Sequence, residues 1–529
     1  MIEEKESGEI AIAPAKKTPM KVNQLKIGVI LSYAQMALGI VIGIIQAPII
    51  IRCLGQSEYG LYNTIVSTLS MLSILSLGFN SSYIRYYARY KKEDNEEAIY
   101  KLNGLFLLIF TIIGLVALAC GIFLTYNLKL VFANGLTQVE YKTAKVLMWI
   151  LTINLAFTFP MSVFQNIISA HEKFVFLKLI GMIRTVLSPL LIIPIVLMGH
   201  KSIALATITV LINLLVDILY LIYVLFSLKQ KFYFKNFEKG LLKSLFGFTI
   251  FIAINLIVDE INSNVDKVLL SRYKGTISAA VYSVGYTLYN FYRQFSTSIS
   301  GVFAPKVHRI YNEHKGDVVL LKQELTSLFV KVGRIQFLIL GLVATGFIFF
   351  GKPFIHFWAG EGYQNAYYIG LLLILPSTIA LIQNIGMEIQ RAENKHKFRS
   401  IAYLIMAGIN IGLTIFLCQR YGEIGAAVGT ALSLILANGL VMNIYYHKAC
   451  NINIWAFWKQ ILRLSLGLIL PIITGTLIAY FINLFVLWKL FLFIIIYTVV
   501  YCGSMWFLGM NNFERELIKK PIRSVLKRK

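Results

Sequence analysis

Polar and ionisable side chains lie inside a long apolar stretch, residues 245–271, at spacings that place them on one face of a helix. One stripe runs at positions i, i+4, i+7 and i+11 and consists of Asn255, Asp259, Asn262 and Asp266. A second stripe beside it consists of Glu260, Asn264 and Lys267. Such groups are costly in hydrocarbon, so these faces are predicted to meet protein or water rather than lipid.

The next stretch, residues 278–303, combines tyrosines with one guanidinium group at the same three- or four-residue spacing. Arginine offers a fork of donors to phosphate oxygens, and its charge does not titrate away. A tyrosine ring offers an apolar face to a sugar ring and a hydroxyl to its oxygens. We therefore expect a cavity that binds a sugar phosphate, with these wall residues: Asn255, Asn262, Tyr282, Tyr286, Tyr289 and Arg293.

Residues 178–227 add Arg184, with Ser188 one turn further on, and the pair Asn213 and Asp217. Arg184 is a second candidate for the cavity. The competing interpretation is structural, because Arg184, Asp217 and Arg293 could pair with one another or with the backbone and only hold helices together. Ordinary helix packing is likewise an alternative for the tyrosines. Three carboxylates are candidates for carrying a coupled H⁺ or Na⁺, with a structural ion pair as the alternative: Asp217, Asp259 and Asp266.

Composition requires a membrane around these residues. The chain has 529 residues, of which 57% are hydrophobic and 14% charged, and its mean hydropathy is +0.71. A bilayer needs about 20 apolar residues per helical crossing, and the apolar runs predict an all-α integral membrane protein with about fourteen crossings. The expected organisation is a disordered cytoplasmic tail (1–24), an N-terminal lobe (25–227), a C-terminal lobe (228–447), two further helices (448–508) and a basic cytoplasmic tail (509–529).

A short internal sequence repeat predicts how these helices are grouped. Arg52, Gly55 and Tyr62 recur 220 residues later as Arg272, Gly275 and Tyr282. Six crossings separate the two copies, so both halves would insert in the same orientation as parallel repeats. Two six-helix lobes would then enclose a central cavity, and two C-terminal helices would lie outside the repeat.

The distribution of basic residues predicts the orientation. With the N-terminus inside, 37 of the 50 Lys and Arg residues fall in inner segments, so both termini are predicted to be cytoplasmic. The net charge of +25 is dispersed over these segments, as anionic headgroups and positive-inside topology require. A nucleic-acid partner is therefore not expected, whereas membrane lipids are.

Enzyme signatures are scarce. The sequence has five Asp and no H-E-x-x-H, G-x-S-x-G or Walker motif, so neither catalysis nor a resident cofactor or metal is expected. The five cysteines form no C-x-x-C pair and are interpreted as packing residues. Transport is the leading class of function. The chain is expected to act as a monomer, with other glycan-assembly proteins as candidate partners.

Several short motifs resemble polysaccharide biosynthesis proteins of the oligosaccharide flippase type, which belong to the multidrug, oligosaccharidyl-lipid and polysaccharide exporter superfamily. The motifs are Leu54-Gly55-Gln56-Ser57-Glu58-Tyr59-Gly60-Leu61-Tyr62, Leu77-Gly78-Phe79 with Arg85-Tyr86-Tyr87-Ala88, and Asp266-Lys267-Val268-Leu269-Leu270 with Tyr282-Ser283. The resemblance in span number and order covers nearly the whole chain. The carboxylates Asp217, Asp259, Glu260 and Asp266 depart from the most basic members, so a purely cationic cavity is not expected.

The resemblance implies fourteen helices in two lobes, a V-shaped cavity and alternating access without ATP hydrolysis. It also implies an O-antigen-type cargo, a polyprenyl-pyrophosphate-linked oligosaccharide passed to the outer leaflet of a bacterial inner membrane. Two alternatives stay open: an ion-coupled multidrug or cation exporter of the same superfamily, favoured by the carboxylates, and a membrane glycan polymerase or ligase.

Overall fold

The computed structural model describes residues 24–133, 136–237, 240–314 and 316–526, and in these ranges the chain is almost entirely helical. The predicted disordered tail lies outside the described residues except for Gln24, and so do the last three residues of the predicted basic tail. The N-terminal half contains α1 (Gln24–Ser70), α2 (Phe79–Lys92), α3 (Glu96–Tyr126), α4 (Lys129–Phe132), α5 (Gln138–Ala170), α6 (Phe174–Leu197) and α7 (Ser202–Ile222).

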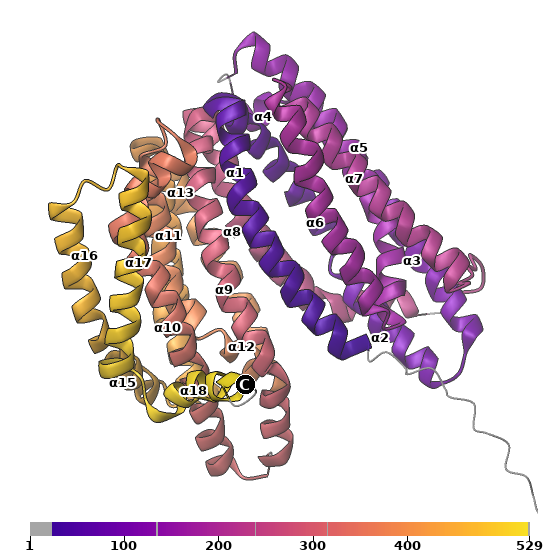
Figure 1. Ribbon diagram of the computed structural model, residues 1–529. Helices are drawn as coiled ribbons and strands as arrows, with labels where there is room; N and C mark the ends of the chain where they lie inside the picture. Colours follow the sequence, from indigo (N-terminus) through magenta and orange to yellow (C-terminus); the bar gives the residue numbers. More distant parts are fainter. Residues whose placement is uncertain (1–23, 134–135, 238–239, 315, 527–529) are drawn as a thin grey trace, which may run out of the picture.

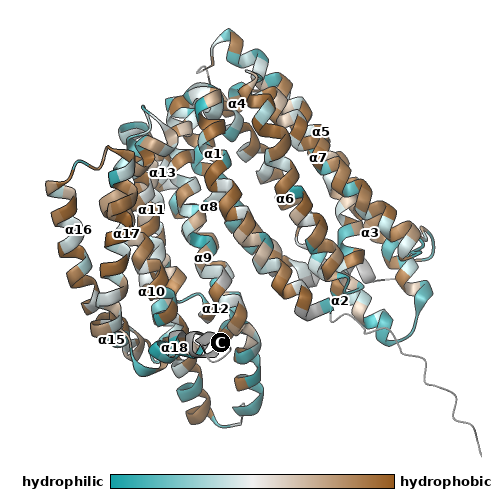
Figure 2. Ribbon diagram, in the orientation of Figure 1, coloured by the Kyte–Doolittle hydropathy of each residue, from teal (hydrophilic) through white to brown (hydrophobic). Residues whose placement is uncertain are grey.

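The C-terminal half begins with α8 (Leu241–Lys274), α9 (Thr276–His314), α10 (Val318–Ala359), α11 (Asn365–Ile382), α12 (Ile385–Ala392), α13 (His396–Leu434) and α14 (Met442–Ala449). It ends with α15 (Ile454–Ser465), α16 (Ile469–Phe481), α17 (Leu487–Ser504) and α18 (Asn512–Leu526). Figure 1 shows the two halves side by side, with α16 and α17 on the outer flank of the C-terminal half. Hydrophobic residues cover much of the helices, and hydrophilic ones gather in the loops at their ends (Figure 2).

Ten helical segments in the described part of the chain are long and apolar enough to cross a membrane. Two of them change direction at a glycine: α1 is interrupted at Gly55 and α13 at Gly422. Helices α8 and α9 are not among these ten, and in α9 the Tyr, Asn, Gln and Arg side chains lower the hydropathy. The all-helical membrane fold is confirmed, and the number fourteen stays a prediction.

The two halves meet at the end of the molecule that holds the turns at Gly55 and Gly275. These glycines share one backbone conformation, with φ, ψ of 75°, 171° and 88°, 177°, which side-chain-bearing residues rarely adopt. The two glycines are equivalent positions of the predicted internal repeat, 220 residues apart, and a repeat requires equivalent positions to share their geometry. We call this end the closed end.

Close packing joins the halves at the closed end. A Cβ atom at Gly60 of α1 would lie 1.9 Å from the carbonyl oxygen of Thr276 in α9, so only glycine allows this approach. A buried apolar cluster continues across the contact, from Ile51 and Leu54 to Ala280 and Trp358. The burial of this cluster gives the closed end a hydrophobic basis.

Hydrogen bonds cross the same contact in both directions. Arg52 of α1 donates to the carbonyl oxygen of Phe357 in α10, and Arg272 of α8 donates to that of Leu130 in α4. These two arginines are also equivalent positions of the predicted internal repeat, and each binds the other half of the molecule. At the opposite end, where α2, α12 and α18 lie, the two halves diverge (Figure 1).

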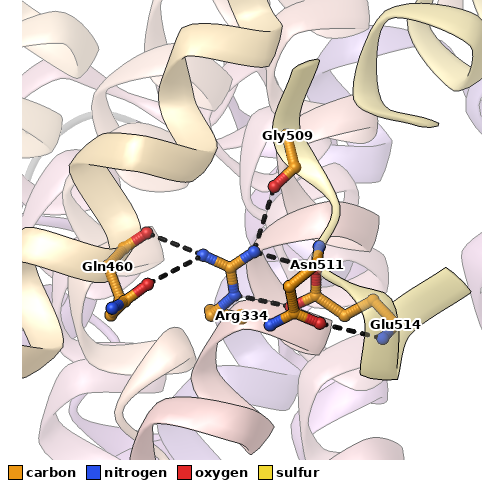
Figure 3. A network of polar contacts seen from close by, with 5 residues as sticks. All are labelled: Arg334, Gln460, Gly509, Asn511 and Glu514. Carbon is orange, nitrogen blue, oxygen red and sulfur yellow. Dashed lines mark hydrogen bonds and ion pairs between the residues drawn. The ribbon is translucent and has the colours of Figure 1, made fainter. Parts of the chain in front are cut away.

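The C-terminal helix α18 is fixed to the C-terminal half by a buried arginine. Arg334 of α10 and Glu514 of α18 are each only 3% exposed, and the guanidinium Nε and Nη2 donate to the carboxylate at 2.6 and 2.8 Å. The remaining donors reach the carbonyl oxygens of Gln460 and Gly509, each at 3.0 Å (Figure 3). The segment holding α15 and the start of α18 is therefore tied to α10.

Replacing one partner of this pair should destabilise the protein strongly, because the other charge would stay buried without a counter-charge. We expect Arg334→Met or Glu514→Met to cost about 3–5 kcal/mol of unfolding free energy, and the double variant to cost less than either. Thermal unfolding in detergent measures this, with the exposed pair Arg309 and Glu313 as the matched control. Single variants no worse than that control would contradict a buried ion pair.

Candidate functional site

Each half of the molecule contains a polar cavity. In the C-terminal half, a cavity of about 490 Å³ lies among α8, α9, α11, α12, α13 and α14. Its wall includes five of the predicted residues: Asp259, Asn262, Tyr286, Tyr289 and Arg293. The stripes on α8 and α9 thus converge on one space, as their helical spacing predicted. We call this space the C-half cavity.

Arg293 is an exposed side chain on the wall of the C-half cavity. Within the described residues it makes no hydrogen bond or ion pair, although Asp259 lies close enough to interact with it electrostatically. Asp259 interacts in the same way with Arg399, at the start of α13. The cavity therefore holds both signs of charge, as the carboxylates of the sequence indicated, and its guanidinium groups keep donors available for a ligand.

The three tyrosines of α9 have different surroundings. Tyr286 and Tyr289 line the C-half cavity with their ring centroids 5.6 Å apart, and the Lys267 ammonium lies 4.4 Å from the centre of the Tyr286 ring. Tyr282 is 1% exposed, is not part of the cavity wall, and donates its hydroxyl proton to Asp266. The position of Tyr282 in this structure therefore corresponds to the alternative of ordinary helix packing, not to contact with a ligand.

Asp266 also lies behind the cavity wall. Besides Tyr282, its carboxylate accepts hydrogen bonds from Thr414 at 3.1 Å and Thr430 at 2.7 Å, both on α13. The same two hydroxyls approach the side-chain oxygen of Asn410 at 3.4 and 3.3 Å. Oxygen ligands of this kind suit a hard cation. The described residues include no cluster of three or more His, Cys, Asp or Glu that could bind a metal.

Asn255 and Glu260 bind neighbouring segments. Asn255 donates to the Ser400 hydroxyl at 3.0 Å and lines a further cavity described below. Glu260 accepts from Asn264 on the same helix and, at 2.9 Å, from Ser73 of the N-terminal half. The second stripe of α8 therefore contacts the other half of the protein.

The N-terminal half has a cavity of about 770 Å³ among α1, α5, α6 and α7, which we call the N-half cavity. Arg184 and Lys178 line it, and its described lining residues include no carboxylate. Arg184 is exposed and makes no hydrogen bond or ion pair with a described residue, although Asp217 lies within electrostatic reach. Gly181, one turn before Arg184, leaves room for the Gln35 amide, which would be 2.5 Å from a Cβ there.

The two cavities lie on either side of the contact between α1 and α9. Gly43 of α1 lines the N-half cavity, and a Cβ atom there would lie 3.0 Å from the ring of Phe291. Phe291 is on α9, two residues before Arg293 and two after Tyr289, which line the C-half cavity. A ligand of moderate length could thus contact both walls.

Some lining residues were missed by the sequence analysis. Arg391 and Arg399 counted there only as inner-loop charges, yet both line the C-half cavity. Gln35 and Gln46 line the N-half cavity, and their spacing of eleven residues, three helical turns, was a usable signal. No comparable signal exists for Arg391 and Arg399, since their position depends on how α12 and α13 meet.

Comparisons with solved structures agree with this fold. The chain is 18% identical to a solved lipid II flippase, MurJ, in an inward closed conformation, with a TM-score of 0.64 over 93% of this chain and 100% of that one. It is 12% identical to an inward-facing multidrug resistance MATE family transporter, with a TM-score of 0.60 over 82% of this chain and 98% of that one. At these identities the likeness establishes the fold.

Sequence comparison adds one relative and one family match. A Shigella flexneri protein, provisionally described as an O-antigen transporter, is 21% identical over 417 residues, which are 76% of this chain and 92% of that protein. A profile described as "Polysaccharide biosynthesis protein" matches residues 26–311. This match covers more than half of the chain, from within α1 to within α9, and includes both predicted arginines. The chain is therefore a member of the polysaccharide biosynthesis protein family.

Proposed function

We propose that the protein is a flippase that moves a polyprenyl-pyrophosphate-linked glycan from the cytoplasmic to the outer leaflet, for surface polysaccharide biosynthesis. The observation that carries this proposal is the pair of arginines, Arg184 and Arg293, one on the wall of each cavity and both without an ion pair among the described residues. The family of the chain and the transporter name of its Shigella relative support the same cargo.

Electrostatics explains why such a cargo suits these walls. A guanidinium group within a membrane protein is costly unless water or a counter-charge reaches it. A diphosphate entering the site loses hydration and regains hydrogen bonds from the two arginine forks. Tyr286 and Tyr289 offer ring faces to sugars, and the amides of Gln35 and Asn262 offer donors and acceptors to sugar hydroxyls.

The arrangement of the halves supports alternating access. They are joined at the closed end and diverge at the other (Figure 1), which favours entry of a headgroup from the diverging end. Rocking of the halves about their contact would expose the cavities to the opposite side, while the lipid tail stays in the bilayer. An inside-negative potential favours outward movement of an anion by about 2.3 kcal/mol per charge per 100 mV, so ATP is not required.

The positions of the carboxylates weaken the alternative that the protein exports cationic drugs. A cationic drug needs an accessible carboxylate, but Asp266 is buried and bonded to three hydroxyls. Asp259 lines the cavity between two arginines with which it interacts. Coupling to H⁺ or Na⁺ through Asp217, Asp259 or Asp266 stays a prediction, and a dependence of transport on Na⁺ or pH checks it.

We further propose a bacterial inner-membrane location with both termini in the cytoplasm, which makes the diverging end cytoplasmic. The exposed residues Glu313, near the end of α9, and Lys142, near the start of α5, lie at opposite ends of the molecule. In a variant without native cysteines, a membrane-impermeant maleimide added to intact cells should label Lys142→Cys and spare Glu313→Cys. The reverse labelling pattern would show the opposite orientation.

Replacing the two arginines tests the cargo site. We expect Arg184→Ala and Arg293→Ala each to lower glycan display at least about tenfold, equivalent to about 1.4 kcal/mol, because each removes a charge-assisted contact with phosphate. Surface glycan is measured in cells that make the cognate lipid-linked unit, and membrane abundance by immunoblotting. Arg309→Ala, on the exposed end of α9, is the matched control. Normal display in both cavity variants would refute the assignment.

A further inference from the structure

A third cavity lies at the diverging end of the molecule, beside the C-half cavity. It has a volume of about 790 Å³, within the size range of roughly 300–1,000 Å³ that small ligands occupy. Ser81 of α2 forms part of its wall, and the rest comes from α8, α12, the start of α13 and the turn between α12 and α13. We call this cavity the vestibule.

The vestibule is continuous in its lining with the C-half cavity. Four residues line both spaces: Asp259, Met387, Arg391 and Arg399. A ligand that leaves the vestibule past these side chains therefore reaches Arg293 next. This position makes the vestibule the first compartment that a headgroup arriving from the diverging end would meet.

Positive charge predominates in the vestibule wall. Among its described lining residues, three are basic, Arg391, Lys397 and Arg399, and one is a carboxylate, Asp259. Arg391 already contacts Glu388 at 2.7 Å through Nη1, but its side chain is 62% exposed. The Arg399 guanidinium carbon lies 4.6 Å from the centre of the Tyr403 ring, which orients the group by stacking. The wall therefore suits an anion with several oxygens.

A buried amide in the same wall independently indicates a missing polar partner. Gln390 of α12 lines the vestibule, is 0% exposed, and neither its Nε2 nor its Oε1 atom has a hydrogen-bond partner within the described chain. Its neighbour Cys450 is a thiol, which is a weak partner at best. A buried amide without partners is unfavourable, so a ligand oxygen at this place would remove that penalty.

We propose that the vestibule is a binding site for the diphosphate group of a lipid-linked substrate, occupied before the headgroup reaches Arg293. Arg391 and Arg399 hold the phosphate oxygens, and Gln390 donates from Nε2 to one of them. This inference rests on the proposed function, because it identifies the first binding site that the same substrate would occupy. It adds a site that does not depend on Arg184 or Arg293.

Calorimetric titration of the purified full-length protein with geranyl diphosphate tests the site. To isolate the vestibule, the titration is done in the Arg184→Ala/Arg293→Ala variant, in which binding of geranyl diphosphate should still be measurable. Adding Arg391→Gln and Arg399→Gln should weaken binding at least tenfold, whereas adding Arg309→Gln, outside the cavities, should not. Geranyl monophosphate should bind more weakly than the diphosphate.

A nearly isosteric change at Gln390 separates ligand binding from folding. Gln390→Leu removes a buried amide that lacks a partner, so its melting temperature should equal or exceed that of the wild type. Its affinity for geranyl diphosphate should nevertheless fall at least threefold. A stable Gln390→Leu protein with unchanged affinity would overturn the role given to this amide.

The remaining outcomes distinguish this inference from the proposed function. Loss of binding in Arg184→Ala/Arg293→Ala, with binding kept in Arg391→Gln/Arg399→Gln, would overturn the vestibule and leave the flippase assignment standing. Normal glycan display in Arg184→Ala/Arg293→Ala would refute the proposed function whatever the titrations give. Tighter binding of UDP than of geranyl diphosphate would overturn the assignment to a lipid-linked ligand.

Discussion

The cost of placing a guanidinium group inside a membrane protein governs this structure. Arg184 and Arg293 lie in the middle of long helices, and neither has an ion pair within the described ranges. Hydrocarbon could not surround them, so the helices that carry them must border polar space. The polar stripe of α8, the tyrosines of α9 and the amides of α1 meet the same requirement, and together they make two cavities instead of one solid bundle.

The closed end provides a close contact between the two halves, which the polar cavities do not. Gly60 lets α1 approach the backbone of Thr276, and Arg52 and Arg272 each bind a carbonyl group of the opposite half. Away from this end the apolar cores are mostly separate clusters, although Leu245 of α8 packs into the N-terminal one. Rocking of the halves about the closed end would leave most of each core intact, and that movement links this fold to transport.

Sequence reasoning recovered the parts of the site that follow from local periodicity. Helical spacing alone placed Asp259, Asn262, Tyr286, Tyr289 and Arg293 on a common wall. It also gathered Asp266 and Tyr282 into that wall, although they pair with each other and with α13 behind it. Arg391, Arg399 and Gln390 could not have been found in this way, because their place depends on the junction of α12 and α13 with α8. Tertiary contacts of that kind leave no period in the sequence.

Alternating access requires that the closed end open during each cycle, and a reversible cross-link tests this most directly. The hydroxyl oxygens of Ser57 and Thr276, on opposite halves, lie 3.3 Å apart, close enough for a disulfide if both are cysteine. In a Cys53→Ala background, oxidised Ser57→Cys/Thr276→Cys protein in liposomes should stop moving a lipid-linked diphosphate, and reduction should restore the rate. Undiminished transport by fully cross-linked protein would contradict the account.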